Sequence, residues 1–250
     1  MSIETNTVLK VQDIKKSTIL NGISFDIDKG EMVAVMGPSG SGKSTLLYNV
    51  SGMDRADSGI SEIDGVNIIS MTEEEKSNVR LKKIGFVFQN MNMLSNLTIK
   101  ENIMYPAFHL KSDGKNKKKI NKKEIEEHAD KLMNMLGITE LADRKITEVS
   151  GGQLQRACIC RSMINSPSII FADEPTGALN KSSSEDVMDA FKSVNENGTT
   201  VLLVTHDSKV AAACNRILYL VDGKIVGELS VTDCDNREKT VSKWLENMGW

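Results

Sequence analysis

The residues best suited to chemistry lie between positions 37 and 45, and we call this stretch the phosphate loop. Its sequence fits the pattern of Gly, any four residues, Gly, Lys and then Ser or Thr, which is typical of phosphate binding. Glycines let successive backbone N–H groups point into one concavity at a helix N-terminus, where the helix dipole also favours an anion. Lys43 adds a positive charge for the β- and γ-phosphates of a nucleotide, and the Ser44 hydroxyl suits Mg²⁺. The candidate binding residues are Gly37, Pro38, Ser39, Gly40, Ser41, Gly42, Lys43, Ser44 and Thr45.

A second candidate is the pair of carboxylates, Asp173 and Glu174, that ends an apolar run at 169–172. The run predicts a buried strand. Ligands of open α/β sheets bind at the carboxyl ends of the strands, so these acids and the phosphate loop can converge. Asp173 suits the Mg²⁺ side, directly or through water, because Mg²⁺ takes few carboxylates. Glu174 suits a general base that polarises an attacking water. The alternative is that both acids only cap a following helix.

Two further polar residues follow predicted strands. Gln89 ends the strand predicted at 84–88, where its amide can bind Mg²⁺ or the attacking water and report the state of the nucleotide. His206 follows the strand predicted at 200–204, where an imidazole can donate to a γ-phosphate and orient the base. Alternatively, Gln89 is only a loop residue and His206 has only a structural role. The functional interpretation of both residues therefore depends on the other motifs in the chain.

A second anion site is predicted about a hundred residues after the first, at the start of a helix expected at 152–165. It places a hydroxyl and two glycines at the helix N-terminus, in the order Ser150, Gly151, Gly152 and Gln153. Helix N-termini bind anions through unpaired N–H groups. Because the chain has one phosphate loop, a second surface for a γ-phosphate suggests a nucleotide shared between two chains.

The remaining elements must position these residues. Apolar alternation predicts an antiparallel edge sheet from 8–11 and 23–27, a buried strand at 32–36, a turn-containing segment at 59–66 and a hairpin at 217–221 and 225–229. Capping-box patterns predict helices that start at Thr72 with Glu75 and at Thr98 with Glu101. Further helices are expected up to Gly137 and over 186–197.

The span from 90 to 149 has no convincing strand, and we interpret about 90–165 as a helical subdomain inserted into the α/β core. Between its helices lies a basic stretch. It is either a solvated loop or a contact with anionic lipid head groups or a partner. Its members are Lys111, Lys115, Lys117, Lys118, Lys119, Lys122 and Lys123.

Composition narrows the class of protein. The 250 residues are 40% hydrophobic and 26% charged, which is typical of a soluble globular chain. A net charge of −3 argues against a dedicated nucleic-acid binder. No apolar run is long enough to span a bilayer, and the N-terminus lacks a signal pattern. The four cysteines are interpreted as reduced thiols, with a redox or metal role as the alternative.

Taken together, the phosphate loop, Gln89, the 149–156 sequence VSGGQLQR, the 169–174 sequence IIFADE and His206 strongly resemble the ATP-binding subunit of an ABC transporter. The resemblance covers roughly 8–229. It implies an α/β P-loop NTPase core of the ABC ATPase type, with an antiparallel β subdomain and the inserted helical subdomain. It also implies one ATP-binding domain at 1–230. The remaining residues, 231–250, are expected to form a polar linker at 233–239 and a short tail, in which the spacing of Trp244, Leu245, Met248 and Trp250 predicts an amphipathic helix that packs on the core.

The same resemblance implies the activity and the partners. Two subunits, in a homodimer or a heterodimer, would enclose two Mg-ATP head to tail, with a homodimer as the simpler expectation. Ser150, Gly151 and Gly152 of one subunit would bind the γ-phosphate held by the other. Closure on ATP and hydrolysis to ADP and phosphate would drive a separate integral membrane permease from the cytoplasmic face of the membrane. The helical insert would receive the permease, and nucleic acid is not expected as a partner.

The segment 172–180, ADEPTGALN, narrows the resemblance to a subgroup. It looks like that of macrolide exporters, lipoprotein-release transporters and bacitracin or antimicrobial-peptide resistance transporters. Importer ATPases more often have Ser where Gly177 stands. This implies export or extrusion of an antimicrobial peptide, a lipid-linked molecule or a lipoprotein. The alternatives are a division-associated ATPase that transmits force without transport, and a soluble ABC-type ATPase that acts on ribosomes or DNA.

Two positions depart from the family pattern. The family usually carries an aromatic residue after the first strand to stack on adenine, and 14–19 contains none. Stacking contributes about 1–3 kcal/mol per base, whereas hydrogen bonds to charged groups contribute about 1.5–3 kcal/mol each. We therefore expect binding to survive, with weaker affinity and poorer base selectivity. Asn180 stands where an aspartate is usual, which puts communication between the two sites in question.

Overall fold

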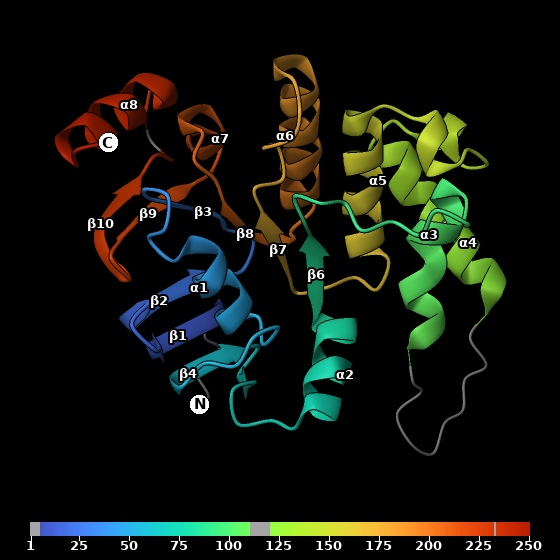
Figure 1. Cartoon of the computed structure of the whole chain (residues 1–250). Coiled ribbons are helices and arrows are strands. Elements are labelled where there is room, and N and C mark those ends of the chain that lie inside the picture. Colours follow the sequence, from blue (N-terminus) through green and yellow to red (C-terminus); the bar gives the residue numbers. More distant parts are fainter. Residues whose placement is uncertain (1–5, 111–120, 233) are drawn as a thin grey trace.

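The protein is described from a computed structural model of the whole chain (Figure 1). The structure describes residues 6–110, 121–232 and 234–250. Most of the basic stretch singled out above therefore lies outside the described residues, and its contact with lipid or a partner stays a prediction. Its last two members, Lys122 and Lys123, begin helix α4 (Lys122–Met135) and form ion pairs with Glu126 and Glu127 one turn further on.

A six-stranded sheet forms the centre of the molecule, in the order β10-β9-β3-β8-β7-β6. Neighbouring strands run parallel, except that β10 pairs antiparallel with β9 in the predicted hairpin. The inner strands are buried apolar runs, as expected where helices cover both faces of a parallel sheet. The strands are β3 (Met32–Met36), β6 (Ile84–Val87), β7 (Ile169–Asp173), β8 (Thr200–Val204), β9 (Arg216–Val221) and β10 (Lys224–Ser230).

A second, antiparallel sheet has the order β2-β1-β4-β5 and confirms the predicted edge sheet. Its longest strands alternate buried and exposed residues, because one face packs on the core and the other meets solvent. The strands are β1 (Thr7–Lys16), β2 (Leu20–Asp28), β4 (Ser58–Ile63) and β5 (Val66–Asn67). Helix α2 (Glu73–Lys83) then leads to β6 and begins with the predicted capping box of Thr72 and Glu75.

Helix α1 (Lys43–Val50) joins the two sheets. Figure 1 shows it beside β1 and β2, with the parallel strands on its other side. Its apolar side chains, Leu46, Leu47 and Val50, belong to one hydrophobic cluster with residues of both sheets. Helix α1, which carries the end of the phosphate loop, therefore packs against both sheets.

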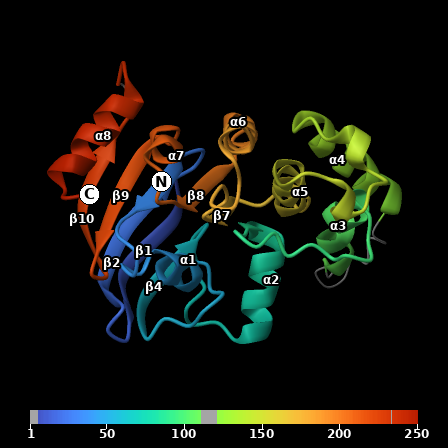
Figure 2. The ribbon, with the colours of Figure 1, turned by 45° about the horizontal axis from the view of Figure 1, so that its top comes forward.

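The described residues between β6 and β7 form a loop and a group of helices, which lie at the far end of the molecule from β1 and β2 (Figures 1 and 2). Helix α5 (Gly151–Met163) packs against β6 of the parallel sheet, and α3 (Ile99–Met104) and α4 pack on α5, through a second hydrophobic cluster. Thr98 and Glu101 form the predicted capping box, and Gly137 follows α4 with a φ of +63°. The region also contains the 3₁₀ helices η1 (Tyr105–His109), η2 (Thr139–Leu141) and η3 (Ile146–Glu148).

Three helices near the C-terminus differ from the predictions. Helix α6 (Lys181–Glu196) begins five residues before the predicted 186, because Asn180 caps it and its first turn has no apolar periodicity to detect. Helix α7 (Ser208–Ala212) is a short helix capped by Asp207 that was not predicted.

Helix α8 (Arg237–Asn247) begins inside the 233–239 segment for which a linker was expected. Its side chains Val241 and Leu245 are buried, and Trp244 meets Tyr219 edge to face at 5.9 Å. The tail therefore packs on β9 of the core, as the amphipathic pattern indicated. The physical reason for the shorter linker is that Asn236 accepts from the Lys239 N–H and starts the helix early.

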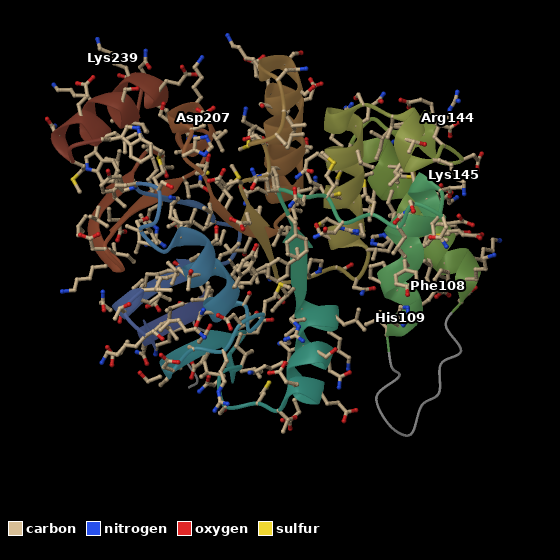
Figure 3. All side chains as sticks on the ribbon, in the orientation of Figure 1. Phe108, His109, Arg144, Lys145, Asp207 and Lys239 are labelled. Carbon is tan, nitrogen blue, oxygen red and sulfur yellow. The ribbon has the colours of Figure 1, made fainter. Side chains whose placement is uncertain are left out.

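Replacing Phe171 by Ala should lower the free energy of unfolding by about 3–5 kcal/mol, because it empties a packed core position. Phe171 is fully buried, and its ring stacks on Phe86 with centroids 5.6 Å apart. Urea denaturation followed by circular dichroism measures the loss. Phe108→Ala is the matched control, because Phe108 is 41% exposed at the end of η1 (Figure 3), and it should cost about 0.5 kcal/mol or less. Equal losses would contradict this description of the core.

Candidate functional site

The site is built at the carboxyl edge of the parallel sheet. Strands β3, β7 and β8 end in register there, since Val35 pairs with Val204 and Val204 pairs with Asp173. Backbone hydrogen bonds continue past the strand ends, from Thr205 N to the Val35 carbonyl at 3.2 Å and from Glu174 N to the Val204 carbonyl at 3.0 Å. Apart from the residues at the start of α5, the candidate residues lie at or just after the carboxyl ends of β3, β6, β7 and β8, or in the first turn of α1.

The phosphate loop has a backbone that only glycine adopts readily at key positions. Gly37, Gly40 and Gly42 have φ values of +152°, +81° and +100°. A Cβ on Gly37 would clash with the Leu220 carbonyl oxygen of β9, so the loop passes directly over that strand. Pro38, Ser39 and Gly40 form the exposed rim of the loop.

The base of the loop holds polar groups that suit an anion. Ser41 is only 4% exposed, and its hydroxyl has no hydrogen-bond partner among the described residues. A buried unpaired hydroxyl costs free energy unless a ligand satisfies it. Lys43 donates to the carbonyls of Gly37 and Pro38 at 2.8 and 2.9 Å, which keeps its charge inside the loop. Burial lowers the pKa of Lys43, although Glu174 and Asp173 act in the opposite direction.

Asp173 accepts hydrogen bonds from two side chains of α1. The Ser44 hydroxyl donates to Oδ1 at 2.8 Å, and the Tyr48 hydroxyl donates to Oδ2 at 2.6 Å. Burial and the bond to Asp173 raise the pKa of Tyr48 to about 12, so the phenol keeps its proton. Sequence reasoning missed Tyr48. The available signal was its position four residues after Ser44, on the same helix face.

Glu174 lies against His206. Its Oε2 is 3.0 Å from Nδ1 of the imidazole, and the histidine side chain is the more exposed partner. Glu174 has a φ of +44°, a left-handed conformation that a residue with a side chain adopts at a cost. A groove of about 1250 Å³ extends from this pair along α6 and α7 and gives it access to solvent. Figure 3 shows Asp207, the neighbour of His206, on the α7 side of the sheet.

Gln89 also reaches this pair. A Cβ on Gly177 would lie 3.1 Å from both the Gln89 amide nitrogen and Glu174 Oε2, so the two side chains flank the same small residue. The absence of a side chain at Gly177 therefore leaves Gln89 and Glu174 close together. Thr45, the last residue of the phosphate loop, is half-buried in α1, and its carbonyl accepts from Asn49.

The second predicted anion site does not meet the first within one chain. Ser150 caps α5 by accepting from the Gln153 N–H, and the Gln153 side chain accepts from the Ser150 N–H. A Cβ on Gly151 would meet Leu179 at 3.1 Å, and one on Gly152 would meet Ser183 at 2.9 Å. Among the interactions of the described residues, none joins this helix terminus to the phosphate loop.

The polar groups of the site fit a nucleoside triphosphate with Mg²⁺. The glycine loop supplies backbone N–H groups, Ser41 supplies an unpaired hydroxyl, and Ser44 and Asp173 supply the oxygen ligands that Mg²⁺ prefers. Within the described ranges, no group of three or more His, Cys, Asp or Glu side chains could hold a metal ion. The cysteines are free, and Cys158, Cys160 and Cys214 are buried. No described helix is sufficiently long and apolar to cross a membrane.

Comparisons with known proteins identify the family. The model of the family described as ABC transporter matches residues 20–177. The chain is 42% identical over 226 residues to the uncharacterized ABC transporter ATP-binding protein YknY of Bacillus subtilis, covering 90% of this chain and 95% of that one. It is 40% identical to the bacitracin export ATP-binding protein BceA of Halalkalibacterium halodurans, covering 88% and 84%.

Another relative is longer than this chain. The macrolide export ATP-binding/permease protein MacB of Neisseria meningitidis is 42% identical over 212 residues, which are 85% of this chain and 32% of MacB. The chain thus spans about a third of MacB.

A solved structure supports the fold and the activity. The ATP-binding cassette MJ0796, in a dimeric post-hydrolysis state bound to ADP and Pi, superposes with a TM-score of 0.78 at 35% identity and covers 89% of this chain and 98% of that one. The predicted α/β core of the ABC ATPase type is confirmed. The chain therefore belongs to the ATP-binding proteins of the ABC transporter family, and its activity is ATP hydrolysis.

Proposed function

We propose that this ATPase closes around two Mg-ATP as a head-to-tail homodimer and powers a separate integral membrane permease from the cytoplasmic face of the membrane. The observation that carries the proposal is the convergence of Lys43, Asp173, Glu174 and His206 at one sheet edge. In the part of the chain that the structure describes, no interaction joins the helix terminus at Ser150 to the phosphate loop.

Each residue of the site has a separate role in ATP binding and hydrolysis in this proposal. Lys43, Ser41 and the loop amides bind the β- and γ-phosphates, where they face developing negative charge. Ser44 and Asp173, with Gln89 nearby, hold Mg²⁺, which when bound neutralises phosphate charge. Glu174 accepts a proton from the attacking water, and His206 orients Glu174 through the 3.0 Å contact. Gln89 connects this group to the helices that follow β6.

The second subunit supplies what one chain lacks. Ser150, Gly151, Gly152 and Gln153 form the start of α5, where N–H groups and the helix dipole attract an anion. In a head-to-tail dimer this terminus faces the γ-phosphate of the partner. Asn180 preserves the local geometry, since it caps α6 by accepting from the Ser183 N–H at 3.0 Å. Asn is as good a cap as Asp, so only the negative charge is lost.

Glu174→Gln should be a monomer without nucleotide and a dimer with Mg-ATP, because the amide cannot accept the proton and the closed state persists. Size-exclusion chromatography with light scattering measures the mass. Wild type with Mg-ATP should return to monomer as ATP is consumed. A Glu174→Gln protein that binds ATP and stays monomeric would contradict a sandwich formed by this subunit alone.

A second substitution tests the role of α5 in the same experiment. Ser150→Arg in the Glu174→Gln background should bind ATP with unchanged affinity and fail to dimerise, because a long side chain then fills the surface offered to the partner's γ-phosphate. Glu124→Gln, an exposed residue of α4, is the control that should leave the dimer intact. A dimer that survives Ser150→Arg would place the interface elsewhere.

In this proposal, the adenine base of ATP packs against an aliphatic residue, Ile19. Ile14 of β1 is fully buried, whereas Ile19 is 43% exposed. The Ile19 Cγ2 lies 3.2 Å from the position of a Cβ on Gly42, so this side chain sits at the end of the phosphate loop. An aliphatic surface contacts any base without the selectivity of an aromatic stack.

Ile19→Tyr should tighten ATP binding by about fivefold or more, since base stacking contributes about 1–3 kcal/mol. Wild type should bind ATP and GTP with affinities within about tenfold of each other. Isothermal titration calorimetry measures both. Leu94→Tyr, which adds the same ring at an exposed position between β6 and α3, should change neither affinity. A wild-type affinity that differs by much more than tenfold between ATP and GTP would contradict an aliphatic contact to the base.

The permease docks, in this proposal, on an apolar groove of about 360 Å³ between β6, α3, η1 and α5. Leu94 and Tyr105 are 41% and 45% exposed at this groove, and Phe86 and Phe88 also line it. Exposed apolar patches mark interaction sites. The argument for a permease as the occupant is that MacB is an ATP-binding/permease protein of which this chain spans a third.

The proposed cargo is an antimicrobial peptide, a lipid-linked molecule or a lipoprotein that is exported or extruded. Support comes from the 172–180 segment and from the names of BceA, a bacitracin export protein, and MacB, a macrolide export protein. A force-transmitting division ATPase would use the same groove, and a ribosome- or DNA-acting ATPase would not.

Tyr105→Glu should abolish co-purification of an integral membrane protein with the tagged chain, because a charge cannot be buried in the apolar groove without cost. Detergent-solubilised membranes of the native host, followed by mass spectrometry, give the readout. Val226→Glu, at a 52% exposed position of β10, is the matched control and should retain the partner. Ribosomal proteins or DNA in place of a membrane protein would overturn the proposal.

A further inference from the structure

Helix α1 offers two hydroxyls to one carboxylate. Ser44 and Tyr48 are four residues apart and share a helix face. The Ser44 hydroxyl bonds Asp173 Oδ1 at 2.8 Å, and the Tyr48 hydroxyl bonds Oδ2 at 2.6 Å. The two oxygens of Asp173 are thus held separately, and the carboxylate plane has little freedom to rotate.

Tyr48 is itself held firmly. Its ring packs against the hydrophobic cluster between the two sheets. Its backbone carbonyl accepts from the N–H groups of Met53 and Asp54 at 2.9 and 3.0 Å, and from the Ser51 hydroxyl at 3.1 Å. The phenol oxygen therefore has a fixed position relative to the end of β7.

We infer that Tyr48 is a positioning residue for the metal site: it fixes Asp173 so that Oδ1 stays beside Ser44 and faces the place where Mg²⁺ binds with the phosphates. Side chains that form hydrogen bonds with a metal ligand fix its orientation before the metal binds. Without the phenol, Asp173 Oδ2 loses a partner, and the carboxylate rotates away from Ser44 for part of the time. This inference rests on the Mg²⁺ site proposed above.

The test measures how much Mg²⁺ tightens nucleotide binding. Isothermal titration calorimetry with ATP, in the Glu174→Gln background to prevent turnover, is performed once with EDTA and once with saturating Mg²⁺. The ratio of the two dissociation constants is the contribution of the metal. Tyr48→Phe keeps the ring and removes only the hydroxyl. It should leave the EDTA affinity unchanged and reduce the ratio by about tenfold, and Mn²⁺ should show the same loss.

Tyr105→Phe is the matched control, because it removes the same hydroxyl from an exposed residue of η1 and should leave the ratio unchanged. An unchanged ratio in Tyr48→Phe overturns the inference. So does an equal loss of affinity with EDTA and with Mg²⁺, because Tyr48 would then support the phosphate loop and not the metal site. If the background protein itself shows no effect of Mg²⁺, the proposed metal site fails before Tyr48 is tested.

Discussion

The site depends on the register of the parallel sheet at its carboxyl edge. Val204 pairs with Val35 on one side and with Asp173 on the other, which sets the phosphate loop, the acidic pair and His206 at one level. Parallel strands that share an edge bring together segments far apart in the chain. A shift of one residue in β7 would turn Asp173 to the opposite face of the sheet and separate it from Ser44.

Helix α1 connects this edge to the rest of the molecule. One face of the helix packs Leu46 and Val50 between the two sheets, while another carries Ser44 and Tyr48 to Asp173. The position of the carboxylate is thus linked to the core between the sheets. The same arrangement buries a cation: burial lowers the pKa of Lys43, while the nearby carboxylates oppose that shift.

Among the described residues, the start of α5 makes no contact with the phosphate loop. The start of α5 is capped by its own Ser150 and Gln153 and packs on Leu179 and Ser183, next to the cap of α6. A movement of the segment around Asn180 would therefore reach both this terminus and, through Gly177, the Gln89 and Glu174 side chains. The geometry joins the start of α5, which we propose faces a partner, with the Gln89 and Glu174 side chains.

The sequence alone determined the elements whose signals are local. The phosphate loop, the buried strands, the capping boxes at Thr72 and Thr98 and the start of a helix near Ser150 were predicted because each depends on neighbouring residue types. Only the tertiary structure showed that Tyr48 bonds Asp173 and that His206, which the sequence suggested could orient the base, lies 3.0 Å from Glu174. It also decided that the tail packs on Tyr219 after a shorter linker than expected. The physical reason is that such contacts follow from strand register and helix packing, which no local pattern encodes.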